Sequence, residues 1–144
     1  MVVPKILPNE PHWEHYLEIH FHSAQEVAPS GAAPVALTSG TGIWTLGNFS
    51  APIIAADAIA APFNLHWAII ANADSNVWHE IVFYYGGSDI ECARIPFSRT
   101  NPFTNSITLP VQTIILPANS QMRAKMMDET GGAQAEIKVF FHRY

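Results

Sequence analysis

Residues 63–87, FNLHWAIIANADSNVWHEIVFYYGG, decide the fold class of this chain. From residue 63 to residue 71, apolar side chains at every second position alternate with a mixed set, which is the period that a half-buried strand requires. Turn-forming residues follow, and a second β-rich run at 77–85 ends at Gly86-Gly87, where positive φ is easily adopted. The second run is interpreted as an arm of a hairpin. The apolar face of the first run is expected to carry Phe63, Leu65, Trp67, Ile69 and Ala71.

Four more runs keep this pattern of strand and turn. Residues 90–97 and 107–116 each contain a proline, which cannot donate to a sheet ladder and therefore indicates an edge or a bulge. Residues 122–126 and 135–141 alternate with a period of two on either side of a turn at 128–132. They predict a C-terminal hairpin in which outward residues of opposite charge pair, with the end of the chain tied into the sheet.

The first third of the chain is less regular. Residues 1–12 contain three prolines and predict an extended N-terminal arm. Residues 16–23 alternate and predict a strand, whereas the small residues at 28–34 predict a loop. Six alanines between residues 51 and 61 favour helix, so residues 53–61 are open to an alternative interpretation as two helical turns.

Together these runs predict an all-β fold, an antiparallel β-sandwich that is jelly-roll-like and has about eight strands. A chain of 144 residues suits one hydrophobic core. The predicted organisation is therefore the arm at 1–12 followed by a single β-sandwich domain at 13–144, with less than about 15% helix.

The composition is poor in charge. Hydrophobic residues make up 49% of the chain and charged residues 13%, against about 25% in an average soluble domain. Either the chain is a monomer with a neutral surface, or it hides part of its exterior against neighbouring subunits, where charge is depleted. We expect the second, a homo-oligomer.

Several function classes conflict with the sequence. The net charge of −5 and only seven Lys and Arg residues argue against nucleic acid as a partner. The longest apolar stretch, 51–63, is interrupted and falls short of the roughly 20 residues that cross a bilayer, so no membrane partner is expected. The single Cys92 cannot form an internal disulfide, and the first fifteen residues have no secretory pattern.

A metal site is a weak candidate at His20, His22 and Glu26. Two histidines two apart on a strand point the same way, and their spacing from Glu26 resembles the first metal motif of the cupins. The glycine that cupins place upstream is absent, and Met122 stands where their last histidine ligand belongs. We therefore expect two histidines on a polar strand face and no bound metal.

No motif for catalysis or for a cofactor is present. No serine has the G-x-S-x-G context, and no glycine-rich stretch has the lysine of a phosphate loop. Cys92 lies within a predicted strand, where a buried, unreactive thiol is expected. The chain is therefore predicted to be no enzyme and to have no cofactor.

Aromatic residues offer one candidate binding surface. Trp78, Glu80, Val82 and Tyr84 share one face of their run, and further aromatics are available to form a platform for carbohydrate. The competing interpretation is that the aromatics fill the core or a subunit interface. The aromatics considered are Trp13, Trp44, Trp67, Trp78, Tyr84 and Tyr85.

From about residue 43 onward, the chain resembles the small jelly-roll cement or decoration proteins on the capsids of tailed bacteriophages. The likeness lies in residues 63–87 and in the ending TIILPANSQMRAKMMDETGGAQAEIKVFFHRY, residues 113–144. In such proteins a proline turn, as at Leu116–Asn119, leads into a strand like 122–126 and a final Gly-Gly turn.

The resemblance implies a structural virion protein that is made in the host cytoplasm and located on the capsid surface. It would bind the major capsid protein between subunits, commonly as a homotrimer, and stabilise the shell. Two alternatives stay open: a carbohydrate-binding β-sandwich module, and a cupin-like metal protein.

Overall fold

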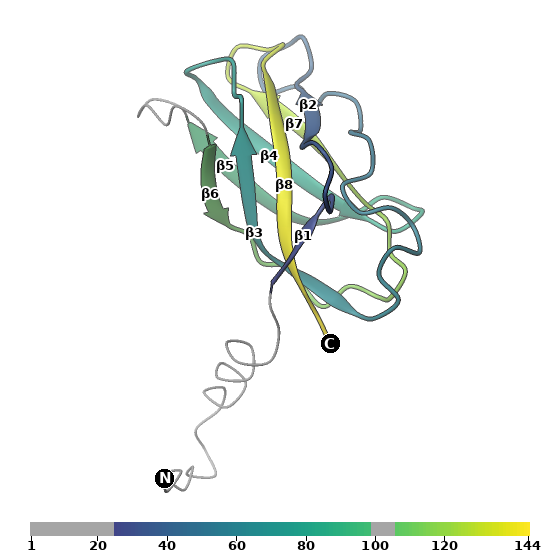
Figure 1. The fold of residues 1–144 in the computed structure, drawn as a ribbon. Coiled ribbons are helices and arrows are strands. Elements are labelled where there is room, and N and C mark those ends of the chain that lie inside the picture. The colour runs from purple at the N-terminus through teal and green to yellow at the C-terminus, as the bar shows by residue number, and fades with distance from the viewer. Residues whose placement is uncertain (1–24, 99–105) are drawn as a thin grey trace, which may run out of the picture.

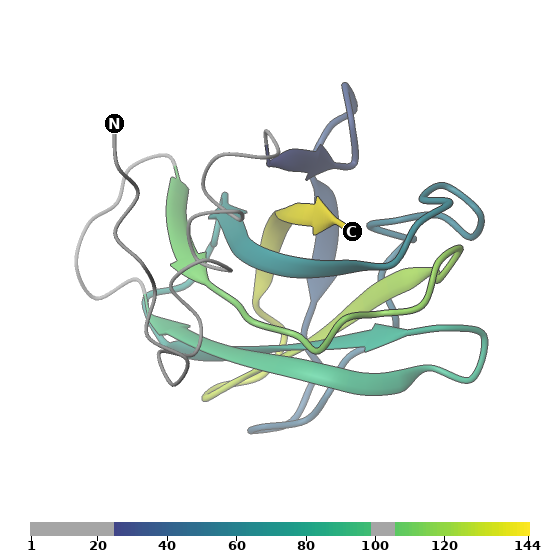
Figure 2. The same cartoon turned by 90° about the horizontal axis from the view of Figure 1, so that it is seen from below.

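In the computed structural model, which describes residues 25–98 and 106–144, two antiparallel β-sheets pack face to face (Figure 1). One sheet has five strands in the order β1-β8-β3-β6, with β2 also paired to β8, and the other has three in the order β5-β4-β7. Figure 2 shows β4 and β5 in a layer separate from β3 and β8. The strands are β1 (Glu26–Ala28), β2 (Val35–Thr38), β3 (Phe63–Ala71), β4 (Trp78–Tyr85), β5 (Ile90–Ser98), β6 (Ser106–Pro110), β7 (Met122–Asp128) and β8 (Gln134–Arg143).

This architecture confirms the predicted all-β, antiparallel sandwich. The two described ranges contain eight strands and no helix, and hence none long and apolar enough to cross a membrane. The predicted arm at 1–12 and the predicted strand at 16–23 lie outside the described residues.

The core forms between the inner faces of the two sheets. Met122, Ala124 and Met126 of β7 are fully buried, as their alternation predicts, and Ile137 and Val139 of β8 are buried opposite them in the second layer. Burying one such large side chain contributes about 1.5–3 kcal/mol, so the inner faces supply most of the driving force for folding.

The predicted apolar face of β3 is correct only in its first half. Phe63 and Leu65 are fully buried, but the register with β8 shifts at His66, where β3 holds an extra residue. After this bulge the inward positions pass to Ala68 and Ile70, and Trp67 is 38% exposed. A single extra residue inverts which side chains face the core, and a period of two in the sequence cannot reveal it.

The predicted C-terminal hairpin is wrong. Strand β7 pairs with β4 in the three-stranded sheet, whereas β8 pairs with β3 in the other sheet. The turn at residues 129–133 therefore crosses between layers, and outward charges of β7 and β8 do not meet. Strand β4 does form a hairpin, but with β5 across Gly86-Gly87, while β3 belongs to the opposite sheet.

The alternative of helix at residues 53–61 is also wrong. The backbone groups of Ile53 and Ile54 bond to Met122, so they extend the ladder beside β7 and are not available to a helix. Upstream, Gly47 and Ser50 donate to Met126 and Ala124 in the same way. Residues 44–54 thus cover the edge of β7 that faces away from β4, and this tertiary pairing overrides the helix propensity of the alanines.

The predicted strand at 107–116 ends at Pro110. Beyond it, the hydroxyl of Thr113 accepts a hydrogen bond from the Leu65 amide at 3.0 Å, and regular pairing returns only where Leu116 and Phe63 exchange two backbone hydrogen bonds. The bulge in β3 interrupts the ladder here. Strands β5 and β6 are the outer strands of their sheets, as Pro96 and Pro110 indicate.

One buried carboxylate connects the two sheets. Asp128, at the end of β7, is fully buried and accepts hydrogen bonds from the hydroxyl of Ser39 and from the turn that leads to β8. The turn donors are the amides of Thr130, Gly131 and Ala133, at 2.7, 2.6 and 3.2 Å, and the hydroxyl of Thr130 at 2.8 Å. Ser39 follows β2, so this carboxylate holds both layers at one end of the sandwich.

Gly131 makes the turn possible. Its φ of +90° lies in the region that favours glycine, and a Cβ at this position would lie 2.4 Å from the carbonyl oxygen of Thr41. The close approach is fixed by two further backbone bonds, from Gly132 to Gly40 and from Ser39 to Ala133.

We predict that Asp128→Asn lowers the free energy of unfolding by about 3 kcal/mol, because an amide NH₂ would face N–H donors and the charge would be lost. Burial raises the pKa of this carboxyl, but the bonds from Ser39, Thr130 and Gly131 outweigh it and hold the pKa below its ordinary value of 3.8. The stabilisation is therefore present above about pH 3.8 and is lost as the pH falls below it. Urea unfolding at neutral and acidic pH measures both effects.

The control is Asp57→Asn, at an exposed residue whose φ of +61° asparagine tolerates. It should leave the free energy of unfolding unchanged within about 0.5 kcal/mol. Equal stability of the Asp128 variant and the wild type would contradict the role assigned to this carboxylate.

Candidate functional site

The outer face of the three-stranded sheet carries the aromatic surface that the sequence indicated. In β4, His79, Ile81 and Phe83 point into the core, so Trp78 and Glu80 point outward on the other face. Trp78 is 51% exposed. The outward residues are Trp78, Glu80, Val82 and Tyr84, as predicted.

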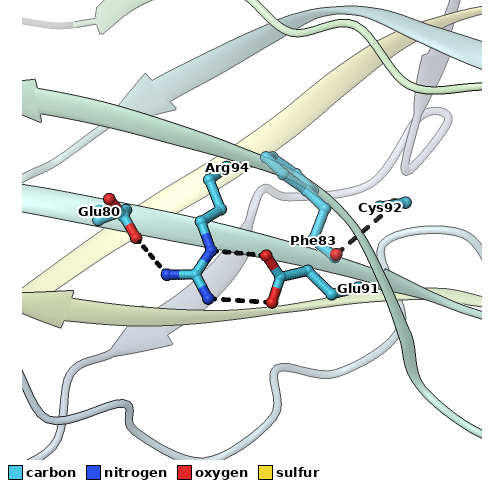
Figure 3. Close-up of polar contacts among 5 residues, drawn as sticks. All are labelled: Glu80, Phe83, Glu91, Cys92 and Arg94. Atoms are coloured by element: carbon cyan, nitrogen blue, oxygen red, sulfur yellow. Dashed lines mark hydrogen bonds and ion pairs between the residues drawn. The ribbon is translucent and has the colours of Figure 1, made fainter.

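A cluster of three charged residues lies on this face, on β4 and β5 (Figure 3). It begins at Glu80, the next outward residue of β4 after Trp78, and extends away from Trp78 to Glu91, the register partner of Tyr84. The guanidinium of Arg94 donates to Glu80 at 2.7 Å and binds both carboxylate oxygens of Glu91 at 2.6 and 3.0 Å. The hydrogen bonds from Arg94 hold the pKa of the Glu91 carboxyl below its ordinary value. The pairs are exposed, so they orient these side chains more than they stabilise the fold.

A β-bulge brings Glu91 to this face. The register of β4 and β5 shifts between Phe83, opposite Ala93, and Tyr84, opposite Glu91, which leaves Cys92 as the extra residue. Residues 91 and 94 would otherwise point to opposite faces of the strand, and the bulge lets both reach outward. Sequence spacing alone could not reveal this pair.

Phe49 covers the other end of the same face. Its ring meets Tyr84 edge to face at 5.1 Å between centroids, and the cationic groups of Arg123 and Lys125 lie 4.2 Å from its centroid. Val82, although it points outward, is fully buried between its register partners Arg94 and Lys125. The exposed aromatic part of this face is therefore the end at Trp78.

The backbone of Trp78 is held in place by Glu129. The amide of Trp78 donates to the carboxylate of Glu129 at 3.0 Å, and the amide of Glu129 donates to the carbonyl of Trp78 at the same distance. On the other side of β7, the amide of Trp44 donates to the carbonyl of Asp128 at 2.7 Å, and Trp44 is 47% exposed. Two exposed tryptophans thus flank the end of β7. Their backbones lie on either side of this strand, about 10 Å apart across the sheet, which is two strand spacings.

Ser39, His79 and Asp128 lie together behind this end of the face, and their residue types are those of a hydrolase triad. The arrangement is different, because Ser39 donates directly to Asp128, and neither ring nitrogen of His79 has a hydrogen-bond partner in the described part of the chain. All three residues are buried. Nucleophilic catalysis needs a serine that bonds to the imidazole and meets the substrate, so this cluster is structural.

The structure gives no support for a metal site at the candidate residues. His20 and His22 lie outside the described residues, and Glu26 forms a bidentate ion pair with Arg143 of β8. The hydrogen bond from Arg143 lowers the pKa of the Glu26 carboxyl. No group of three metal-ligating side chains occurs within residues 25–98 and 106–144.

Cys92 was predicted to be buried, but the structure leaves it half-buried in β5. Burial raises the pKa of its thiol to about 12, which disfavours the thiolate at neutral pH, and its Sγ lies 3.5 Å from the carbonyl oxygen of Phe83 (Figure 3).

A pocket of about 500 Å³ lies between β1, the turn that follows it and the loop at residues 52–59. Among the described residues, Phe141 is the only aromatic one in its lining, and it is almost fully buried. The charged groups of the lining, Glu26 and Arg143, are paired with each other. The described lining of this pocket therefore lacks an exposed aromatic side chain such as Trp78.

Comparison with known proteins gives a likeness in fold, without a match in sequence. The sequence matches no family model and no curated protein. Among solved structures, the fold is similar to a carbohydrate-binding module of lichenase 5A from Cellvibrio mixtus in complex with cellotriose, with a TM-score of 0.42 and 15% sequence identity. The likeness covers 84% of this chain and 87% of that one, and at this level it assigns no function.

Proposed function

We propose that this domain is a non-catalytic carbohydrate-binding module whose ligand lies beside Trp78 on the outer face of the three-stranded sheet. The observation that carries the proposal is the 51% exposure of Trp78 on a sheet face that is otherwise covered or charged. An exposed indole next to oriented polar groups combines the apolar and hydrogen-bonding elements of a small-molecule site.

The chemistry of a sugar fits this surface. The C–H face of a pyranose ring is apolar and can stack on the indole, whereas its hydroxyl groups need hydrogen-bond partners at the ring edge. Glu80, the next outward residue of β4 after Trp78, offers such a partner together with the guanidinium of Arg94 that bonds to it, because charged donors and acceptors form the stronger hydrogen bonds. Their mutual pairing holds them in place before a ligand arrives, which reduces the entropy lost on binding.

Binding is favoured over hydrolysis. A glycosidase needs one carboxyl that remains protonated near neutral pH to act as general acid. At this face the bidentate contact with Arg94 lowers the pKa of Glu91 and favours the carboxylate.

We predict that Trp78→Ala weakens oligosaccharide binding about tenfold, because a stacked aromatic contact contributes about 1.5 kcal/mol. An array of linear oligosaccharides identifies a ligand, and calorimetric titration then compares the variant with the wild type. Trp67→Ala is the matched control, since Trp67 is 38% exposed but lies on β3 of the other sheet, and it should bind like the wild type. Failure of all glycans to bind, or equal binding by the Trp78 variant, would refute the proposal.

A second candidate function is that of a capsid cement protein, an oligomeric virion subunit that binds the major capsid protein. It is favoured by exposed aliphatic side chains, above all Ile114 at 66% and Ile115 at 53%, which lie between β6 and β7. Exposed aliphatic residues together with 13% charge suit a surface that another subunit covers.

For this candidate we predict that the full-length protein sediments as a trimer at micromolar concentration. We also predict that it binds capsids. The double variant Ile114→Glu, Ile115→Glu should dissociate it, because charge is unfavourable in the centre of an interface. The control is Asn76→Glu, at an exposed residue that follows the end of β3 opposite to Phe63, whereas Ile114 and Ile115 precede Leu116, which pairs with Phe63. A wild-type monomer that does not bind capsids would exclude the role.

A further inference from the structure

His79 is a titratable group sealed inside the sandwich. It is fully buried, and neither of its ring nitrogens has a hydrogen-bond partner in the described part of the chain. Its ring stacks on Phe97 of β5, with 4.5 Å between centroids and 5° between the planes. An imidazole in such a place is tolerated when it is neutral, since burial costs a charged ring its hydration.

The charges around His79 do not reverse this preference. Burial lowers the pKa of the imidazole below its ordinary value of 6.5, and the carboxylate of Asp128, the backbone of Val77 and the carboxylate of Asp74 act in the opposite direction to a smaller extent. From β5 it faces the uncharged ring of Phe97, while the backbone of Phe97 also raises the pKa to a smaller extent than burial lowers it. Asp128 is of limited help, because its oxygens are occupied by five donors.

His79 is also directly connected to the exposed tryptophan. It follows Trp78 in β4, and its register partner across the sheet is Asp128. The residue after Asp128 is Glu129, whose amide and carboxylate both bond to the backbone of Trp78. Any displacement of the His79 ring therefore acts on both strands that position Trp78.

We propose that His79 is an acid-sensitive latch, whose protonation loosens the end of the sandwich at β4 and β7 and releases the ligand held beside Trp78. The release of ligand rests on the proposed carbohydrate site, whereas the loosening of the fold does not.

The direction of the effect follows from linkage. Below about pH 6.5 the unfolded chain protonates this histidine and the folded chain resists, so the folded state loses stability as the pH falls. The unfolding equilibrium constant should rise by up to about tenfold for each pH unit below 6.5, until the ring also protonates in the folded state.

The first experiment measures urea unfolding of the full chain at pH 7.5 and 5.5 for the wild type, His79→Phe and the control Ile81→Val. Phenylalanine preserves the stack on Phe97 and cannot protonate, so this variant should lose less stability on acidification, by up to about tenfold in the unfolding equilibrium constant. The control changes a buried, inward-facing residue of the same strand without altering a titratable group, and it should respond to pH like the wild type. An equal pH response of His79→Phe and wild type overturns the latch.

A second measurement does not depend on a folded variant. NMR titration of the wild-type imidazole should give a midpoint for His79 below 6.5, and a midpoint at or above 6.5 overturns the proposal.

Calorimetric titration with the bound oligosaccharide then tests release. Affinity should fall between pH 7.5 and 5.5 in the wild type and stay constant in His79→Phe. If no glycan binds, the proposed carbohydrate-binding function is wrong, but the unfolding data still show whether protonation of His79 destabilises the fold. If glycan binds with equal pH dependence in both proteins, the latch fails while the proposed function stands.

Discussion

The carboxylate of Asp128 is the constraint on which the rest of this structure depends. Its five hydrogen bonds join the end of β7 to Ser39 beside the opposite sheet and to the turn that leads into β8. Without this connection, the amides of Thr130, Gly131 and Ala133 would lose their acceptor, and a buried amide such as that of Ala133 costs about 1–3 kcal/mol when it is unpaired. The same turn places Glu129 against the backbone of Trp78. The hydrogen bonds of Asp128, which we call the joint, therefore also help to fix the position of the exposed Trp78.

Two β-bulges decide which side chains reach water. The extra residue His66 turns Trp67 outward, and the extra residue Cys92 brings Glu91 to the same face as Arg94. Each bulge adds one residue to its strand. The alternation of inward and outward side chains beyond the bulge is therefore shifted by one residue. The charged cluster of Glu80, Arg94 and Glu91 thus depends on a backbone irregularity, and it lies over a strand whose other face carries the buried His79.

Much of the fold could be predicted from the sequence, because alternation in β4, β7 and β8 reports directly on burial. Met122, Ala124 and Met126 follow that rule without exception. The pairing of strands could not be predicted, since the turn at 129–133 resembles a hairpin turn and the crossing depends on contacts with Ser39, far away in sequence. The site was predicted in part: the shared face of Trp78 is correct, but Glu26 meets Arg143, which is 117 residues distant, and no local pattern indicates that pair.

We infer that the joint at Asp128 is as stable as the core and that it positions the surface at Trp78. The decisive measurement is hydrogen exchange of the backbone amides of Thr130, Gly131 and Ala133, because these amides donate to the buried carboxylate. We predict that they exchange only with global unfolding, as is expected of the amides between β4 and β7, although they lie in a turn. Exchange as rapid as that of the exposed turn residue Ser88 would contradict it.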